Sequence, residues 1–298
     1  MRDKLKTAAR AVCSPAGVLG IALETAWVAT HVASYPFGLT REKLRELDRY
    51  SLADLPPLQR GLHVADVEAA GTPILLLHGM VDNRSIFTLL RRGLRRRGFG
   101  RIVAINYSVL THDIPSAARS LAGRVERVCA ETGYERVHIV GHSLGGLIAR
   151  YYVQRLGGDE RVHTLVCLGT PHGGTHAARL LPRRIAGQLR TDSDVIAELA
   201  QRAPGCRTRF ISVWSDLDQL IVPKRSARID HPDLHAHNVF VRGLGHLSLP
   251  VDGRVVHAIC TTLAQLDSAG NSTSAQVVDL RDKAPARKPA RKRGFLIG

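Results

Sequence analysis

The segment V-H-I-V-G-H-S-L-G-G-L-I-A-R-Y-Y, residues 137–152, carries the strongest structural signal in this chain of 298 residues. A short apolar run ends at G-H-S-L-G, and a helical pattern begins directly after it. A serine between two glycines at such a junction is typical of a nucleophile elbow, a strained turn that exposes the hydroxyl. Gly141 and Gly145 omit the side chains that would collide where strand and helix meet. We therefore predict that Ser143 is a nucleophile, faced by the N-terminal amides of the following helix.

The composition is that of a soluble globular protein, with 44% hydrophobic and 23% charged residues. A chain of this length can bury one large core and still carry appendages. The formal net charge is +16, part of it in the basic segment 269–298. Because no nucleic-acid-binding module accompanies this charge, we expect no nucleic acid partner. The basicity indicates solubility and attraction to anionic surfaces.

The cysteines argue against a disulfide framework or a zinc ribbon, because their number is odd and no C-x-x-C spacing occurs. A single disulfide between loops, for instance one involving Cys206, stays open. The five cysteines are Cys13, Cys129, Cys167, Cys206 and Cys260.

The N-terminal extension, residues 1–60, begins with basic residues and continues into a mostly apolar stretch at 11–39. A cleaved signal peptide lacks a clear cleavage site here. A membrane-spanning helix would place Glu24 near its middle, at a cost of about 2–3 kcal/mol. We favour an amphipathic helix that lies on the main domain or in a bilayer interface, with Glu24 and His31 on its polar face. Membrane-surface association through 11–39 stays open, and a cytoplasmic or membrane-associated location is favoured over secretion.

Strand and helix patterns alternate through the main domain, residues 61–268. Helical patterns separate the strands, and one of them has Asp113 as its N-cap and Gly133 at its end. This alternation predicts an α/β fold with a doubly wound, mostly parallel sheet, a helical N-terminal extension and a small helical cap at 176–206. The tail 269–298 is too polar to order itself. Strands are expected at 74–77, 102–105, directly after Glu135, at 162–168, 210–214 and 239–241, with a last helix at 258–266.

A serine nucleophile needs a base to take its proton and a carboxylate to orient that base. His246 follows the strand at 239–241 in G-L-G-H-L-S-L, where nearby glycines let the backbone bend so that the ring can reach back over the strand ends. Asp216 and Asp218 both follow the strand at 210–214. We expect one of them to pair with His246.

The chain resembles the α/β-hydrolase superfamily, in particular the bacterial triacylglycerol lipases and esterases. The matching segments are L-L-L-H-G-M (75–80), G-H-S-L-G (141–145), T-P-H-G-G-T (170–175), W-S-D-L-D-Q-L-I-V-P (214–223) and G-L-G-H (243–246), and the resemblance covers about residues 70–265. It implies Ser143, Asp218 and His246 as a catalytic triad, with Asp216 as the alternative acid. It also implies an oxyanion hole built from the backbone amides of Met80 and Leu144.

Three more histidines, at positions 231, 235 and 237, lie with Asp233 at spacings that could suit a metal. In a connecting loop of a basic protein such residues are more typical of the surface, so we predict no metal site and no cofactor.

The expected function is hydrolysis of a carboxylic ester, of lipid or acyl type, through an acyl-enzyme on Ser143. An acyltransferase or thioesterase with the same triad is the alternative, and a non-catalytic binding protein of the same fold is a further one. The segment 176–206 is interpreted either as a cap over the acyl site or as a packed helical crossover. In the cap interpretation Leu181, Ile185 and Leu189 form one stripe of a helix.

Overall fold

The computed structural model of the chain describes residues 22, 24–26, 71–80, 82–106, 113–180 and 184–264. Most of the N-terminal extension and the whole basic tail lie outside the described residues, and so do the predictions of membrane association and disorder made for them. In the part of the chain that is described, no helix is both long enough and apolar enough to span a bilayer.

Six parallel strands form one sheet, in the order β2-β1-β3-β4-β5-β6. Each of the four-residue strands β1 and β2 and the elbow strand β3 is buried along its full length, as continuous apolar runs predict for strands covered on both faces. The strands are β1 (Ile74–Leu77), β2 (Ile102–Ile105), β3 (Val137–His142), β4 (Val162–Leu168), β5 (Arg209–Ser215) and β6 (His235–Val241).

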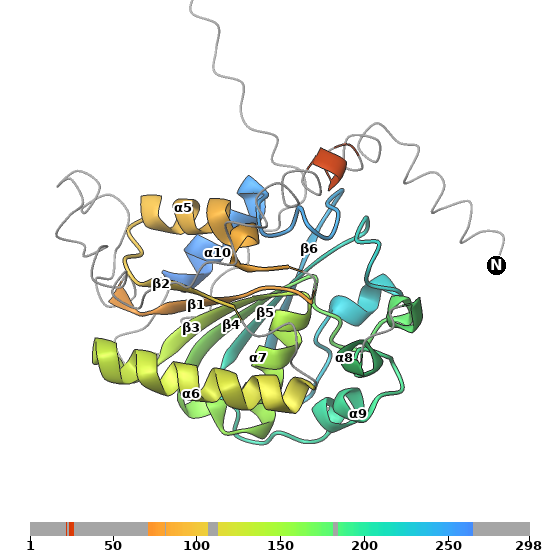
Figure 1. Ribbon diagram of the computed structural model, residues 1–298, viewed down its shortest axis with the longest axis horizontal. Coiled ribbons are helices and arrows are strands. Elements are labelled where there is room, and N and C mark those ends of the chain that lie inside the picture. Colours follow the sequence, from red (N-terminus) through yellow and green to blue (C-terminus); the bar gives the residue numbers. More distant parts are fainter. Residues whose placement is uncertain are drawn as a thin grey trace, which may run out of the picture.

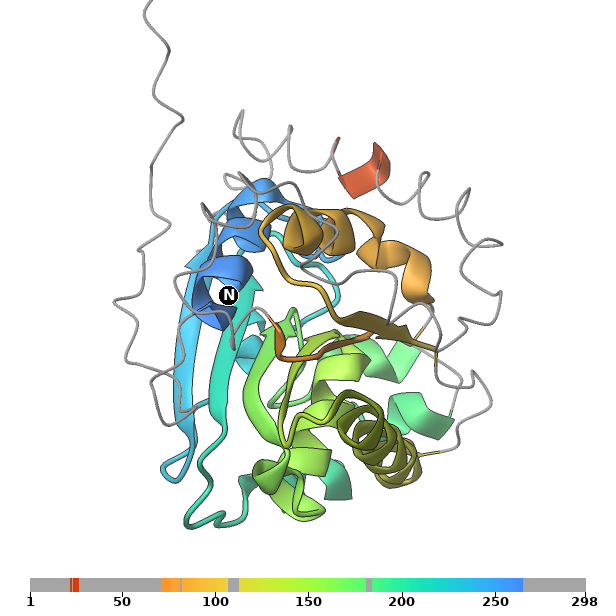
Figure 2. The same cartoon turned by 90° about the vertical axis from the view of Figure 1, so that its left-hand side faces the viewer.

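Helices cover both faces of the sheet, which confirms the predicted α/β architecture (Figures 1 and 2). α5 (Thr88–Arg96) and α10 (Gly253–Leu263) pack on one face, and α6 (Ile114–Thr132) and α7 (Leu144–Arg155) on the other. Each face has its own buried apolar cluster. The shorter helices are η3 (Arg84–Phe87), η4 (Gly158–Glu160), η5 (His176–Leu180), α8 (Arg184–Gly187), α9 (Asp194–Ala200) and η6 (Lys224–Ala227).

Helix α6 shows how local sequence sets an element's ends. The Asp113 side chain accepts a hydrogen bond from the Ser116 amide at 2.6 Å, and Gly133 ends the helix in a left-handed conformation. Between them the predicted stripe is buried. The stripe consists of Ile114, Ala118, Leu121, Val125 and Val128.

One strand begins earlier than its apolar pattern predicts. β6 starts at His235 rather than at 239, because it is an edge strand whose first residues are mostly polar and at least partly exposed. α10 overlaps the last helix expected at 258–266, and Asp252 caps it by accepting from the amides of Arg254 and Val255.

The predicted single helical stripe of the cap segment is wrong. α8 ends at Gly187, and Leu189 lies in the turn after it, while Leu181 lies outside the described residues. Glycine is a poor helix residue, and the amides of Gln188 and Leu189 close tight turns there by bonding to Ile185 and Ala186. Ile185 and Leu189 are nevertheless both buried in the apolar cluster on the α6–α7 face.

Helix α9 is fastened to α7 by side-chain donors that bind its C-terminal carbonyl groups. Arg150 donates to the Leu199 carbonyl at 3.0 Å, and Arg155 donates to those of Glu198 and Gln201. The Glu198 carbonyl also accepts from the Gln201 amide at 3.1 Å, and the guanidinium groups add charged donors to the carbonyls at this helix end. Burial lowers the pKa of Arg150 to about 10, which leaves it charged at neutral pH. Helix α9, in the second half of the 176–206 segment, is therefore bonded directly to α7.

Candidate active site

Ser143 occupies the strained turn between β3 and α7. Its backbone has φ 54° and ψ −122°, and it is the one non-glycine residue with positive φ in the described part of the chain. The Ser143 amide donates to the Leu168 carbonyl at 2.9 Å, and its own carbonyl accepts from the Gly146 amide at 3.1 Å. Strain of this kind is held by surrounding contacts and occurs preferentially at functional sites.

The two elbow glycines are required by close backbone approach. A Cβ atom at Gly141 would lie 2.5 Å from the Gly146 Cα and nitrogen. One at Gly145 would collide with the carbonyl oxygens of Leu77 and His78, at the end of β1. Since backbone atoms cannot give way as a flexible side chain can, these positions accept only glycine without moving the turn.

The segment after β1 lies against the serine. A Cβ at Gly79 would stand 3.2 Å from the Ser143 Cβ, so the Gly79 backbone abuts the nucleophile. The His78 Nδ1 bonds the Gly79 carbonyl oxygen at 2.8 Å. In a trans peptide the N–H points opposite to the C=O, so this bond also fixes the direction of the Met80 amide. Leu144, whose amide is the other expected oxyanion donor, begins α7 directly after Ser143.

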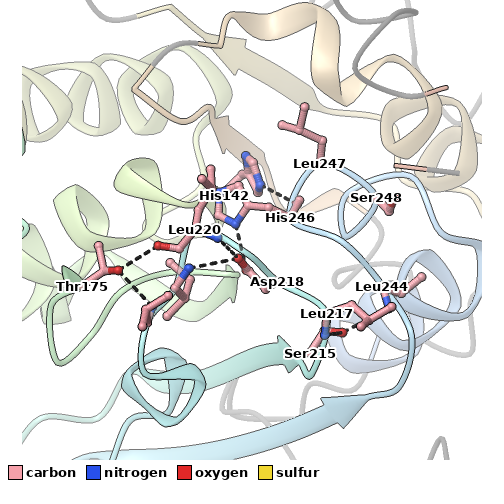
Figure 3. Close-up of polar contacts among 12 residues, drawn as sticks. His142, Thr175, Ser215, Leu217, Asp218, Leu220, Leu244, His246, Leu247 and Ser248 are labelled. Atoms are coloured by element: carbon pink, nitrogen blue, oxygen red, sulfur yellow. Dashed lines mark hydrogen bonds and ion pairs between the residues drawn. The ribbon is translucent and has the colours of Figure 1, made fainter. Parts of the chain in front are cut away.

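His246 and Asp218 form a buried pair on loops after β6 and β5 (Figure 3). The His246 Nδ1 donates to the Asp218 Oδ2 at 2.8 Å. The second oxygen of Asp218 accepts from the amides of Leu220 and Ile221 at 3.0 and 3.1 Å. With Nδ1 bonded to the carboxylate, the Nε2 of the neutral ring is the nitrogen left to accept a proton.

The surroundings set the charges of this pair. Burial alone would raise the pKa of Asp218, but the charge and hydrogen bond of His246 and the two backbone amides hold it below its usual value. Burial likewise acts to lower the pKa of His246, yet the charge and hydrogen bond of Asp218 raise it above 6.5. Asp218 is therefore an anion whose partner is poised to accept a proton near neutral pH.

Two contacts bring this pair to the elbow. Gly169 follows Leu168, the acceptor of the Ser143 amide, and a Cβ there would stand 2.9 Å from the Asp218 Oδ2 and 3.1 Å from the His246 Nδ1. His142, directly before the serine, has its ring centroid 4.6 Å from that of His246. The structure thus gathers the serine, the histidine and the carboxylate at the carboxyl ends of β3, β5 and β6.

Asp216 does not pair with His246. Its Oδ1 accepts from the Gly243 amide at 2.7 Å, and the neighbouring Ser215 hydroxyl accepts from the Leu244 amide at 3.1 Å. Both bonds tie the turn that leads to His246 back to the end of β5, and Figure 3 shows the one between Ser215 and Leu244. The resemblance implied Asp218 as the partner of His246 and Asp216 as the alternative, and the structure pairs His246 with Asp218.

Further polar groups at the site had no predicted role there. The His142 Nε2 donates to the His246 carbonyl at 3.0 Å, and its Nδ1 lies 3.2 Å from the buried Asp82 carboxylate. The Thr175 hydroxyl donates to the Leu220 carbonyl at 2.7 Å and accepts from the Val222 amide at 2.9 Å (Figure 3). His142 and Thr175 lie within the quoted segments 141–145 and 170–175, but only the structure shows which groups they bond.

The histidines considered for a metal do not all lie in a loop, since β6 begins at His235 and includes His237, and their neighbours bind other groups. His231 bonds the Gln201 carbonyl at 2.9 Å, and Asp233 accepts from Arg202 and from the Ala203 amide. Among the residues that the structure describes, no group of three or more potential ligands converges on a point where a metal ion could bind. The four described cysteines, which exclude Cys13, are free thiols.

Comparison with known proteins gives one family match, to the model described as alpha/beta hydrolase fold, over residues 72–228. A triacylglycerol lipase of Pseudarthrobacter phenanthrenivorans is 30% identical over 122 residues, which are 38% of this chain and 38% of the relative. A triacylglycerol lipase of Burkholderia plantarii is also 30% identical over 122 residues, 38% of this chain and 34% of that protein. The chain thus matches little more than a third of the length of these curated relatives.

Solved structures share the architecture at low sequence identity. The mature form of the lipase BlEst2 from Bacillus licheniformis superposes with a TM-score of 0.54 at 15% identity, covering 68% of this chain and 96% of that one. Aspergillus fumigatus lipase B gives a TM-score of 0.56 at 14% identity, covering 71% and 58%. At such identity the likeness concerns the fold.

Proposed function

The chain belongs to the alpha/beta hydrolase fold family, and from this premise we propose that it is a serine hydrolase that cleaves carboxylic esters through an acyl-enzyme on Ser143. The observation that carries the proposal is the buried hydrogen bond between His246 and Asp218, directly beside the strained Ser143 turn. A surface ion pair would not need this burial, and a merely structural serine would not need the strain.

In the proposed reaction the Ser143 oxygen attacks the ester carbonyl carbon while the His246 Nε2 takes the hydroxyl proton. The carbonyl oxygen becomes an oxyanion that accepts hydrogen bonds from the Met80 and Leu144 amides, each contributing about 3 kcal/mol. The C–O bond to the alcohol then breaks, and His246 gives its proton to the leaving oxygen. A water molecule attacks the acyl-enzyme by the same steps and releases the acid. Asp218 keeps its charge throughout and stabilises the imidazolium.

We propose lipid or acyl esters as the substrate class. Leu220 and Val222, on the loop that carries Asp218, are 49% and 40% exposed, and Thr175 holds the backbone of both. Met80 packs against the apolar cluster that contains Ile185 and Leu189. The segment next to the serine and the loop that carries Asp218 thus both carry apolar side chains, and the curated relatives at 30% identity are named triacylglycerol lipases. Ile185 and Leu189 would border the acyl chain.

The test is labelling with a fluorophosphonate together with hydrolysis of p-nitrophenyl esters of graded chain length. The wild-type protein should be labelled once and should hydrolyse esters, with a preference for longer acyl chains. Ser143→Ala should lose both properties and keep its thermal unfolding temperature, since the hydroxyl makes no cap bond to α7. Labelling of a different serine in this variant would contradict the proposal.

A further inference from the structure

Glu24, in the short described piece of the N-terminal extension, reaches the loop that carries His246. Its Oε1 accepts from the Leu247 amide at 2.7 Å. Its Oε2 accepts from the Ser248 amide at 3.0 Å and from the Ser248 hydroxyl at 2.6 Å. The helical residues around Glu24 lie on the α5–α10 side of the sheet, close to the end of the domain where this loop runs (Figures 1 and 2).

The loop is shaped around this carboxylate. A Cβ at Gly245 would collide with the Glu24 carboxyl group, so Gly245 leaves room for it on one side of His246. Leu247 and Ser248 supply donors on the other side. Glu24 is half-buried, and its carboxylate accepts three hydrogen bonds from this loop. A carboxylate partly removed from water without such donors would be destabilising.

The peptide group between His246 and Leu247 is held at both ends. Its N–H donates to Glu24, and its C=O accepts from His142 Nε2 at 3.0 Å. The peptide plane contains the His246 Cα, so hydrogen bonds at both of its polar atoms hold that Cα in place and restrict the positions that the ring can take. The His246 ring then meets Asp218 on one side.

From this clamp we propose that Glu24 is a positioning residue for the catalytic histidine, so that the N-terminal extension completes the active site of the hydrolase domain. The proposal rests on the proposed function, in which His246 is the general base. Glu24 touches neither substrate nor reacting atoms; it acts through the backbone of the histidine loop.

The charge of Glu24 also acts on the base. The charged or titratable groups that face His246 are Asp218 after β5, Asp82 after β1, His142 at the end of β3, and Glu24. Burial acts to lower the pKa of His246, and the three carboxylates, with Asp218 foremost, outweigh it. Removing the charge of Glu24 should therefore lower the pKa of His246, so that the ring stays neutral to a lower pH. The acid limb of the kcat/KM profile should move to lower pH with it.

The experiment compares Glu24→Gln with Glu24→Asp and with Glu126→Gln in the full-length protein. Glu126 pairs with Arg161 on the surface and controls for the loss of one carboxylate. Glu24→Gln keeps the side-chain length but places an NH₂ group opposite backbone donors, so kcat should fall about 10- to 100-fold with little change in KM. Glu24→Asp should retain the wild-type pH profile at reduced kcat, and Glu126→Gln should match wild type in both.

A second readout needs no turnover: the titration of the His246 ring followed by NMR should shift to lower pH in Glu24→Gln. If wild type neither hydrolyses esters nor reacts with fluorophosphonate, the proposed function fails, while this titration still tests the clamp. Wild-type kcat, pH profile and ring titration in Glu24→Gln would overturn the inference. The inference would also be overturned if Glu24→Gln unfolded at a lower temperature than wild type but kept the wild-type acid limb when assayed well below its unfolding temperature.

Discussion

The sharpest prediction compares Asp218→Asn with Asp216→Asn. Both aspartates lie on one loop and both accept a backbone amide, but only Asp218 bonds the His246 ring. Asparagine at 218 preserves size and can still accept the Leu220 amide, yet it removes the charge that faces Nδ1. It can also donate its NH₂ to Nδ1, which would favour the tautomer whose Nε2 carries the proton and cannot act as a base.

The magnitude follows from the contact distance. Unit charges 2.8 Å apart interact by about 6 kcal/mol at an effective dielectric constant of about 20. Because each 1.36 kcal/mol is tenfold in rate, the loss of this stabilisation of the imidazolium sets an upper limit of about four orders of magnitude in kcat. Asp216→Asn keeps an oxygen that can accept the Gly243 amide, so its kcat should stay within about tenfold of wild type.

The measurement is kcat and KM for a soluble p-nitrophenyl ester, with circular dichroism to show that both variants are folded. Asp218→Asn should affect kcat rather than KM, since the lost interaction forms only as His246 becomes charged. A large loss in Asp216→Asn with a small one in Asp218→Asn would refute the assignment of the acid and exchange the two roles.

Three further outcomes are expected. The acid limb of wild-type kcat/KM should have its midpoint above pH 6.5. The pKa of His246 is raised above 6.5, and the neutral ring that acts as the base is lost as the pH falls through this pKa. A midpoint below pH 6 would contradict the prediction. Ile185→Ala should lower kcat/KM for long-chain esters more than for acetate esters. Its control, Leu121→Ala, creates a cavity under α6 in the same cluster and should lower the free energy of unfolding by about 2–5 kcal/mol without changing the chain-length preference. Equal losses of kcat/KM for long and short chains in Ile185→Ala would indicate a packed crossover. Gly145→Ala should lower the free energy of unfolding, measured with denaturant, by about 3 kcal/mol or more, because the new Cβ collides with backbone carbonyls. The control is Gly123→Ala on α6, where the new Cβ has no atom within 4 Å. It should be neutral or stabilising by up to about 1 kcal/mol.

The sheet and the elbow could be predicted because their signals are local. A buried parallel strand is an apolar run, and two glycines around Ser143 mark a close strand–helix approach. Where a strand lies at the edge, as β6 does, its polar first half leaves no such run, and the prediction began late.

The wider site could not be predicted, because its contacts join residues that no local pattern connects. Glu24 and Leu247 are 223 positions apart, and His142 and His246 are 104 apart. Glu24 in the sequence was only a charge that interrupts an apolar stretch, compatible with a solvent-facing or domain-facing position. Asp82 likewise follows the L-L-L-H-G-M segment without a recognisable motif, and its role beside His142 depends on how β1 and β3 pair.

The span between Glu24 and the histidine loop also bears on when the protein becomes competent during its synthesis. The Ser143 amide bonds the Leu168 carbonyl in β4, so the turn depends on a strand made after α7, and His246 follows Ser143 by about a hundred residues. At about 5–20 residues per second this is a delay of roughly 5–20 s on the ribosome, during which Ser143 lacks its base. Glu24 is made before the whole hydrolase domain, and its partners Leu247 and Ser248 are among the last residues of that domain. Under the proposed function, reactivity would therefore arise only when the two ends of the domain meet.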